Sequence, residues 1–393
     1  MASRVFVWGS GSGLGVPVDK EGVCPFPTRV ERLPPNLSFT QVACGDAFVM
    51  ALDERGCVWT WGVNRGGRLG HDGADGVPST VKEGLDGCKC TCIAAGQSHM
   101  LAVMERRGKG DAGGDRESVV MAWGNGFHGA LGVPTADAAR PVEVPHIHDA
   151  VAVAAGYANS ACVTRSGELY IWGDNTFCKS GGGRDALVVV SSRHPQKWIL
   201  GGKLASYCSL GSLYSAVTTQ DGSVLTWGYG GAGNLGHGDR KNVAKPKVVQ
   251  ELDGVRITHV SCTVGQINTV TDPDQVVGKE NPHTMFVAGD TTGALYTCGT
   301  CHKGMLGNHT TKILSPPAGD ELVPYLVGSA PRDDPKQQPT EYLKDEVCVQ
   351  VASSSIHSAV MTQSGRVYTF GCASGGRMGI EQYMSGLHGG RSA

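Results

Sequence analysis

One pattern recurs seven times along this 393-residue chain, and it restricts the fold more than any other feature. Each copy contains an apolar run that ends in an aromatic residue, replaced by Cys298 in one copy, and glycine, as in VWTWG and VLTWG. A second pair follows, which is Leu-Gly in most copies. Successive copies are about 50 to 70 residues apart, a spacing typical of repeat architectures built from one supersecondary unit. The pairs are Trp8-Gly9, Trp61-Gly62, Trp123-Gly124, Trp172-Gly173, Trp227-Gly228, Cys298-Gly299 and Phe370-Gly371.

Two further motifs complete each repeat. All copies but the first are preceded by a segment such as VACGDAFVMAL or IAAGQSHMLAV, and most are followed by Pro and then β-branched or apolar residues, as in PKVVQEL. The chain holds 58 glycines, which suit tight turns between short strands. Each repeat therefore predicts four short antiparallel strands, a sheet that cannot bury both faces alone. Radial packing of such sheets in an all-β propeller would bury them.

The combined pattern of VACG-x-x-H-S-x-A-L, G-x-V-Y-x-W-G and L-G-x-G with a later Pro resembles the regulator of chromosome condensation repeat. That family forms seven-bladed β-propellers, so the resemblance implies the same fold here. It runs from Val5 to about Gly379. We therefore expect one propeller domain over residues 1–379 and a carboxy-terminal tail over residues 380–393.

The strand count leaves the closure of the ring open. Seven aromatic-glycine strands and six of each other kind are too few for seven complete four-stranded blades. Either the amino-terminal aromatic-glycine strand and PTRVERL form a short seventh blade, or PTRVERL completes a blade with the last three strands and the ring has six blades. The resemblance favours seven blades with one incomplete blade. We expect residues 380–393 or a partner segment to cover the edge that an incomplete blade exposes.

Three insertions interrupt the repeats: Glu105–Ser118, Asp272–His283 and Gly328–Glu346. We place the first two between the second and third strands of their repeats and the third after a fourth strand, so all three should emerge on one face. The basic cluster ERRGKG of the first insertion is balanced by acidic residues, which favours a solvated loop over binding of phosphate or an acidic protein. The candidate partner-binding residues are Arg106, Arg107, Lys109, Lys279, Glu280, Arg332, Asp333 and Asp334.

Several local motifs suggest chemistry only when they are taken out of the repeat. Gly228-x-Gly230-x-x-Gly233 has the spacing of a dinucleotide-binding loop, but a proline-led strand follows where a phosphate-binding helix is needed. The segments CGTCH and CKCTC fall in repeat strands, and no nearby Cys/His pair completes a tetrahedral zinc site. His99 and His357 occupy equivalent repeat positions and are expected to be structural. We predict no catalytic residues, no cofactor and no metal.

Composition narrows the function further. Lys and Arg total 34 and Asp and Glu 36, so no overall field favours nucleic acid. The sequence shows no secretion signal or membrane span, and its fourteen cysteines are expected to be reduced, which predicts an intracellular protein, cytoplasmic rather than nuclear. We expect a non-enzymatic interaction propeller that docks other proteins into a larger assembly. The alternative that the resemblance implies is a nucleotide exchange factor for a small GTPase such as Ran. Two departures from that family weaken this alternative. The sequence shows no basic tail ahead of the first repeat, and none of the loops that follow an aromatic-glycine strand is enlarged.

Overall fold

The computed structural model describes residues 4–11, 13–107, 116–178, 192–264, 281–301, 304–307, 320–327, 343 and 345–379. These residues form 25 short strands, and their helices are single 3-10 turns of three residues. None of the described helices has the length and hydropathy to cross a membrane. The chain divides into two compact units, Met1–Asn175 with Val189–Cys208 and Thr176–Val188 with Ser209–Ala393.

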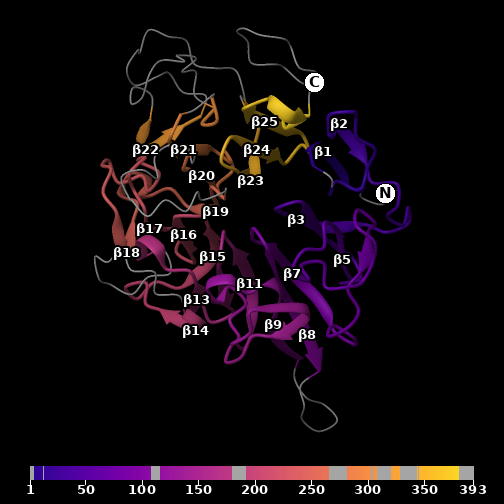
Figure 1. Cartoon of the computed structure of the whole chain (residues 1–393). Helices are drawn as coiled ribbons and strands as arrows, with labels where there is room; N and C mark the ends of the chain where they lie inside the picture. The colour runs from indigo at the N-terminus through magenta and orange to yellow at the C-terminus, as the bar shows by residue number, and fades with distance from the viewer. Residues whose placement is uncertain are drawn as a thin grey trace. The chain divides into compact units, whose positions relative to one another are not determined.

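The first unit contains one two-stranded sheet followed by three four-stranded sheets (Figure 1). In each of them the strands hydrogen-bond in chain order, and every pairing is antiparallel. The strands are β1 (Phe6–Ser10) and β2 (Val23–Arg29); β3 (Phe39–Gly45), β4 (Phe48–Asp53), β5 (Val58–Gly62) and β6 (Ser79–Thr80); β7 (Lys89–Ala95), β8 (His99–Arg107), β9 (Arg116–Asn125) and β10 (Asp137–Glu143); and β11 (Ala150–Ala155), β12 (Asn159–Thr164), β13 (Leu169–Gly173) and β14 (Ser192–Trp198).

The second unit contains two four-stranded sheets and one three-stranded sheet, again in chain order. The boundary between the units falls inside β15, the first strand of the first of these sheets. The strands are β15 (Ala205–Leu210), β16 (Tyr214–Thr219), β17 (Val224–Gly228) and β18 (Val243–Val248); β19 (Ile257–Cys262), β20 (His283–Ala288), β21 (Leu295–Gly299) and β22 (Glu321–Leu326); and β23 (Cys348–Ser353), β24 (His357–Thr362) and β25 (Val367–Gly371).

These sheets confirm the predicted all-β architecture of repeated antiparallel units. The expected seven blades are matched in part, because seven sheets are present but two of them, rather than one, have fewer than four strands among the described residues. The amino-terminal strand β1 pairs with β2, which contains the first part of PTRVERL. In the described part of the chain, β25 hydrogen-bonds to β24 alone.

The predicted position of the second insertion is wrong. Since β19 pairs directly with β20, the chain between Cys262 and His283 joins the first and second strands of that sheet, not the second and third. The third insertion joins β22 to β23, as predicted. In an antiparallel meander these two connections leave opposite ends of the strands. The expectation that all insertions emerge on one face therefore fails for the second.

The aromatic-glycine strands form the core because their aromatic side chains lie between successive sheets. The indole rings of Trp61, Trp123, Trp172 and Trp227 are fully buried. In two of them the Nε1–H also ties one repeat to the previous one, since Trp61 donates to the carbonyl of Leu14 at 3.1 Å and Trp172 to that of Ala130 at 2.9 Å. These tryptophans thus pack between neighbouring sheets, and in Trp61 and Trp172 the indole also hydrogen-bonds to the preceding repeat.

The glycine that follows the aromatic residue is required by two separate constraints, which Gly228 illustrates. Its φ of +109° lies in a region that side chains other than hydrogen rarely allow. A Cβ at this position would also lie 2.6 Å from the Cα of Tyr214 on the adjacent strand β16. Any larger residue would therefore push apart the second and third strands of the sheet.

The fourth strands share a second feature, a proline next to the third strand, which in all described pairs except β5–β6 lies at an interruption of the pairing. In the β17–β18 pair, Thr226 opposes Lys247 and Gly228 opposes Val243, so three residues including Pro246 bulge opposite Trp227. A proline without an N–H fits such a bulge at the outer strand of a sheet. Proline has the same place in every other described pair of a third and a fourth strand. The residue before the aromatic position pairs with a residue of the fourth strand, and the residue just before that partner is proline: Pro27, Pro78, Pro141, Pro195 and Pro324.

Candidate interaction site

The most distinctive charged cluster of the described residues lies where β8 and β9 extend beyond the length of their counterparts. These strands run for nine and ten residues, while the equivalent strands β12 and β13 have six and five. Their added pairs include Glu105 with Ser118 and Arg106 with Glu117. The ends of the first insertion are therefore strand, not the solvated loop that the sequence favoured. The connection itself, residues 108–115, lies outside the described part of the chain.

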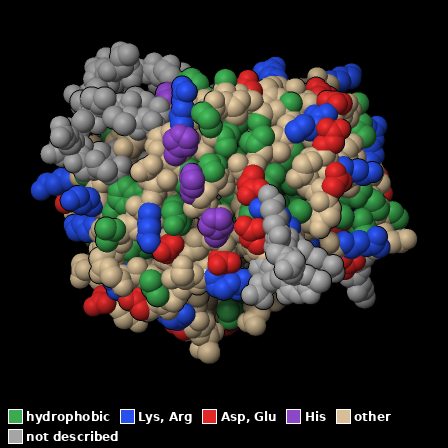
Figure 2. All heavy atoms as spheres, turned by 90° about the horizontal axis from the view of Figure 1, so that it is seen from below, with side chains coloured by type: hydrophobic (Ala, Val, Ile, Leu, Met, Phe, Trp, Pro, Cys, Tyr) green, Lys and Arg blue, Asp and Glu red, His purple; other side chains and the backbone are tan. Residues whose placement is uncertain are grey.

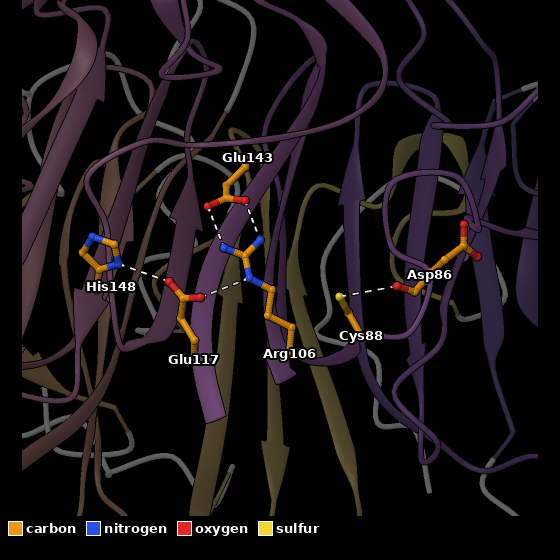
Figure 3. Close-up of polar contacts among 6 residues, drawn as sticks. All are labelled: Asp86, Cys88, Arg106, Glu117, Glu143 and His148. Atoms are coloured by element: carbon orange, nitrogen blue, oxygen red, sulfur yellow. Dashed lines mark hydrogen bonds and ion pairs between the residues drawn. The ribbon is translucent and has the colours of Figure 1, made fainter. Parts of the chain in front are cut away.

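Arg106 is the centre of this cluster (Figure 3). Its guanidinium forms a two-pronged contact with Glu143 of β10, at 2.6 and 3.0 Å, and its Nε donates to Glu117 of β9 at 3.2 Å. These charge-assisted bonds raise the pKa of Arg106, so it stays a cation, and they connect three strands of one sheet. The base of the hairpin is consequently held more firmly than paired backbone alone would hold it.

Glu117 connects the hairpin to the segment after β10. Its second carboxylate oxygen lies 3.4 Å from Nδ1 of His148, whose side chain is exposed. The hydrogen bond from Arg106, against a smaller effect of burial, lowers the pKa of Glu117, so this carboxylate is ionised at neutral pH. Two carboxylates and one guanidinium leave the cluster with a net negative charge while the imidazole is neutral.

A second ion-pair cluster lies on the same sheet and uses the same kind of residue. Arg140 of β10 contacts Glu83 at 2.5 Å and also pairs with Asp72, both from the segments next to β6. The pairing lowers the pKa of Asp72, chiefly through its hydrogen bond from Arg140. Figure 2 shows acidic and basic side chains interspersed over the face that it displays. Mixed charge of this kind gives local specificity without a strong field for polyanions.

Nearby, the run CKCTC makes only local contacts. Cys88 lies in the turn before β7, where its Sγ is 3.7 Å from the carbonyl oxygen of Asp86 (Figure 3). Burial raises the pKa of the Cys90 thiol to about 12, which makes it a poor nucleophile. Among the described residues, no group of three or more His, Cys, Asp or Glu side chains is arranged to bind a metal ion.

The buried histidines form hydrogen-bonded links between repeats. His99 Nε2 lies 2.9 Å from Ser160 Oγ, and that hydroxyl donates to the carbonyl of Ala130 at 2.7 Å. Because a hydroxyl has one proton, the imidazole must donate from Nε2 and cannot accept the serine proton. Burial lowers the pKa of His99 to about 4. A serine and a histidine could in principle act as a nucleophile and its base. Here the imidazole donates to the hydroxyl instead of accepting its proton, so the pair is a structural link.

The second unit repeats this link with a histidine that the sequence analysis did not identify. His283 Nε2 lies 2.8 Å from Ser358 Oγ, which donates to the carbonyl of Met305. His283 opposes Gly299 as His99 opposes Gly124, so it occupies the same repeat position. The similarity of HTMFVA to HSAVMT was the signal that could have placed it. His357, at the corresponding position of the next sheet, accepts or donates a hydrogen bond at 2.6 Å to Ser354.

The glycine-rich loop from Gly228 to Gly233 uses its amides internally. Gly230 N–H donates to the side chain of Asn242 at 2.9 Å, and Gly233 N–H donates to the carbonyl of Gly230 at 2.9 Å. Asn234 reaches back to the carbonyl of Tyr229 at 2.8 Å. Amides that are engaged in this way cannot also hold a phosphate. The loop is the turn between β17 and β18.

Of the candidate partner-binding residues, only Arg106 has a described side chain. Arg107 lies at the end of β8, paired with Arg116 in the backbone register. The others lie outside the described residues: Lys109, Lys279, Glu280, Arg332, Asp333 and Asp334. The structure therefore places one of the candidates in a defined cluster and leaves the remaining ones as predictions.

Comparison with known proteins decides the family. The model of the RCC1-like domain matches residues 4–386, nearly the whole chain. The chain belongs to the RCC1-like domain family. Solved structures agree in fold: Prp20p from Saccharomyces cerevisiae is similar with a TM-score of 0.74 and 21% identity, covering 98% of this chain and 84% of that one. Human WBSCR16 is similar with a TM-score of 0.72 and 21% identity, covering 97% and 91%. The β-propeller predicted for this RCC1-like chain is confirmed.

The curated relatives of this RCC1-like chain differ widely in what surrounds the propeller. The Arabidopsis thaliana ultraviolet-B receptor UVR8 is 27% identical over 346 residues, which are 86% of this chain and 66% of UVR8. The human E3 ubiquitin-protein ligase HERC2 is 30% identical over 301 residues, 75% of this chain but 6% of the ligase. The chain thus spans less than two thirds of these relatives, and in HERC2 only a small fraction.

Proposed function

We propose that this RCC1-like propeller is a non-enzymatic interaction module that docks a partner protein through the extended β8–β9 hairpin. The observation that carries the proposal is the Arg106 cluster, which fixes the base of the longest strands of the described chain. A docking element gains affinity when its geometry is set before binding. The 6% share of HERC2 that resembles this chain supports a modular role, since such a domain there accompanies a much larger protein.

The proposal separates two parts of the hairpin. Residues 108–115, with Lys109, would contact the partner, while Arg106, Glu117 and Glu143 would hold the stem. Replacement of residues 108–115 by a short Gly-Ser turn should leave the fold unchanged, because loop length costs little free energy. The same replacement should reduce the recovery of associated proteins when the tagged chain is purified from its native cell.

The control for this experiment is Arg240→Ala, which removes a surface cation that pairs with Asp320 on a different sheet. Recovery should stay unchanged in the control, while thermal unfolding of both variants should resemble that of the unmodified chain. Full recovery of every associated protein by the hairpin variant would exclude this hairpin as the docking element.

The alternative function is nucleotide exchange on a small GTPase. It is supported by similarity of fold to Prp20p, a protein studied for its binding to Gsp1p and histones. The loop lengths argue against it, because an exchange factor of this family is expected to have an enlarged loop after one aromatic-glycine strand. The turn from Trp227 to Leu235 has the same length as its counterpart from Trp61 to Leu69. An exchange factor should accelerate release of labelled GDP from a panel of small GTPases at substoichiometric concentration. Such acceleration would replace the docking proposal, and retention on nucleosomes that falls with salt would instead indicate chromatin binding.

A further inference from the structure

The turn between β14 and β15 exposes two large aliphatic side chains. Ile199 is 84% exposed and Leu204 is 49% exposed, and both residues lie in the first compact unit. Ile199 is the fourth residue after the proline of its outer strand. In the other repeats no aliphatic side chain of this size stands there, since the position is occupied by Glu31, Lys82, Pro145, Gln250 and Gly328. The exposed isoleucine is therefore a feature of this one turn.

The geometry of the turn places the two side chains on one side. A backbone hydrogen bond of 3.3 Å closes the turn Leu200–Lys203, and its central residues Gly201 and Gly202 have φ values of +64° and +88°. Two central residues of positive φ are typical of a type I′ turn, which joins two antiparallel segments. Because side chains alternate along such segments, Ile199 and Leu204 lie on the same side. They form a small apolar tip.

The turn is anchored on its other side. Leu200 is only 5% exposed, as expected for a side chain that points away from its neighbour Ile199. A Cβ on Gly201 or on Gly202 would meet no atom within 4 Å, so the backbone of the turn projects from the molecule. The apolar tip can therefore reach a surface without a change in the fold.

The segment that carries the tip is basic. Residues 186–220 contain no Asp or Glu, but they include Arg193, Lys197 and Lys203. Arg193 and Lys197 belong to β14 and are exposed, and Lys203 lies in the turn itself. The tip thus combines exposed aliphatic side chains with neighbouring cations.

The turn after β12 lies beside the tip and adds charges of both signs. Its Gly167 carbonyl accepts the N–H of Ala205 at 2.9 Å. Glu168 of this turn forms an ion pair with Lys197. The charged residues around the tip are then four basic and two acidic ones: Arg165, Arg193, Lys197, Lys203, Asp149 and Glu168. The balance remains positive.

We propose that the apolar tip docks the protein onto an anionic lipid bilayer. Ile199 and Leu204 would enter the boundary between headgroups and acyl chains, and Lys203 and Arg193 would be attracted by the headgroups. Peripheral binding of this kind gains from apolar burial and from electrostatic attraction together. A surface for a protein partner would instead be expected to be rich in aromatic residues and poor in lysine. With two inserted side chains, the docking is weak and reversible.

The test measures the partition of the full chain onto large vesicles by sedimentation. Vesicles of phosphatidylcholine with phosphatidylserine should bind the protein, and vesicles of phosphatidylcholine alone should bind it more weakly. Binding to the anionic vesicles should fall as the salt concentration rises, because salt screens the cations. Ile199→Asp should lower the partition coefficient at least about tenfold, since the burial of one large aliphatic side chain is lost. Lys203→Gln should lower it about fivefold, the effect of one lysine near an anionic surface.

The matched control is Phe26→Asp, which introduces the same charge in place of another apolar side chain, 48% exposed, on β2. Its partition should equal that of the unmodified chain, and thermal unfolding of all three variants should be unchanged. Absence of binding to the anionic vesicles, equal binding to both kinds of vesicle, or undiminished binding of Ile199→Asp would overturn the inference. Self-association that Ile199→Asp abolishes, without binding to vesicles, would overturn it in favour of a second copy. Residues 108–115 are unchanged in these variants, so the docking proposal for the β8–β9 hairpin is tested separately.

Discussion

Acid should destabilise this propeller well above the pH at which most carboxylates are protonated, because two imidazoles are buried in their neutral form. His99 and His283 are 1% and 0% exposed, and burial lowers the pKa of each to about 4. In the unfolded chain the same groups have a pKa of about 6.5. Between these values the unfolded state binds more protons than the folded state, so stability falls as the pH falls through this window.

The magnitude follows from the difference in pKa. Each histidine can cost the folded state about 3 kcal/mol once the pH is below both values, and about 2 kcal/mol at pH 5. The two groups belong to separate units, so their effects should add to about 4 kcal/mol at pH 5. Since Asp and Glu ordinarily have a pKa near 4, pH 5 reports mainly on the histidines.

The assay is urea unfolding followed by tryptophan fluorescence at pH 7.5 and pH 5. The variant His99→Asn/His283→Asn removes both titrating groups and uses the residue that the repeat has at Asn159. When the pH is lowered from 7.5 to 5, the free energy of unfolding of this double variant should fall by about 4 kcal/mol less than that of the unmodified chain. His194→Asn, which removes an exposed histidine of β14, should behave like the unmodified chain. An unaltered pH dependence in the double variant would refute the assignment of these imidazoles as buried neutral donors.

Three further predictions use the same unfolding measurement. Trp123→Ala should destabilise the chain by about 3 to 5 kcal/mol because its indole is fully buried, whereas Phe127→Ala, at a ring that is 58% exposed, should cost less than about 1 kcal/mol. Gly228→Ala should cost at least about 3 kcal/mol through backbone strain and overlap, while Gly254→Ala, with φ of +79° and open space around it, should cost about 1 kcal/mol. Arg106→Ala should cost about 1 kcal/mol, and Arg106→Lys should not fully restore it, since lysine cannot form the two-pronged contact with Glu143. Equal stabilities within either of the first two pairs, or full recovery of stability in Arg106→Lys, would contradict the reason given.

The repeat made most of the fold predictable. Seven aromatic-glycine pairs located the third strands, because a buried aromatic residue and a glycine of positive φ leave little freedom in what surrounds them. The strand prediction was wrong where the repeat is interrupted. The segment CTVGQINTVT has the composition of a first strand, turn and second strand, yet the pairing partner of β19 begins at His283, beyond an insertion.

The candidate site was less predictable because it depends on contacts between distant residues. ERRGKG was identified as a basic cluster, but its charge pattern did not reveal that Arg106 lies within a strand. The decisive partner, Glu143, is 37 residues away on β10. Likewise, the prolines of the fourth strands were visible in the sequence, while their position in a bulge appeared only with the register.

Those prolines also bear on how the protein behaves at high concentration. The outer strand of a sheet is the usual starting point for edge-to-edge aggregation, and proline and local distortion are among the features that prevent it. The described outer strands β2, β10, β14, β18 and β22 carry both, so their edges are poor templates for another copy of the chain. The same proline bulges that shape the outer strands would then also help the protein to stay soluble.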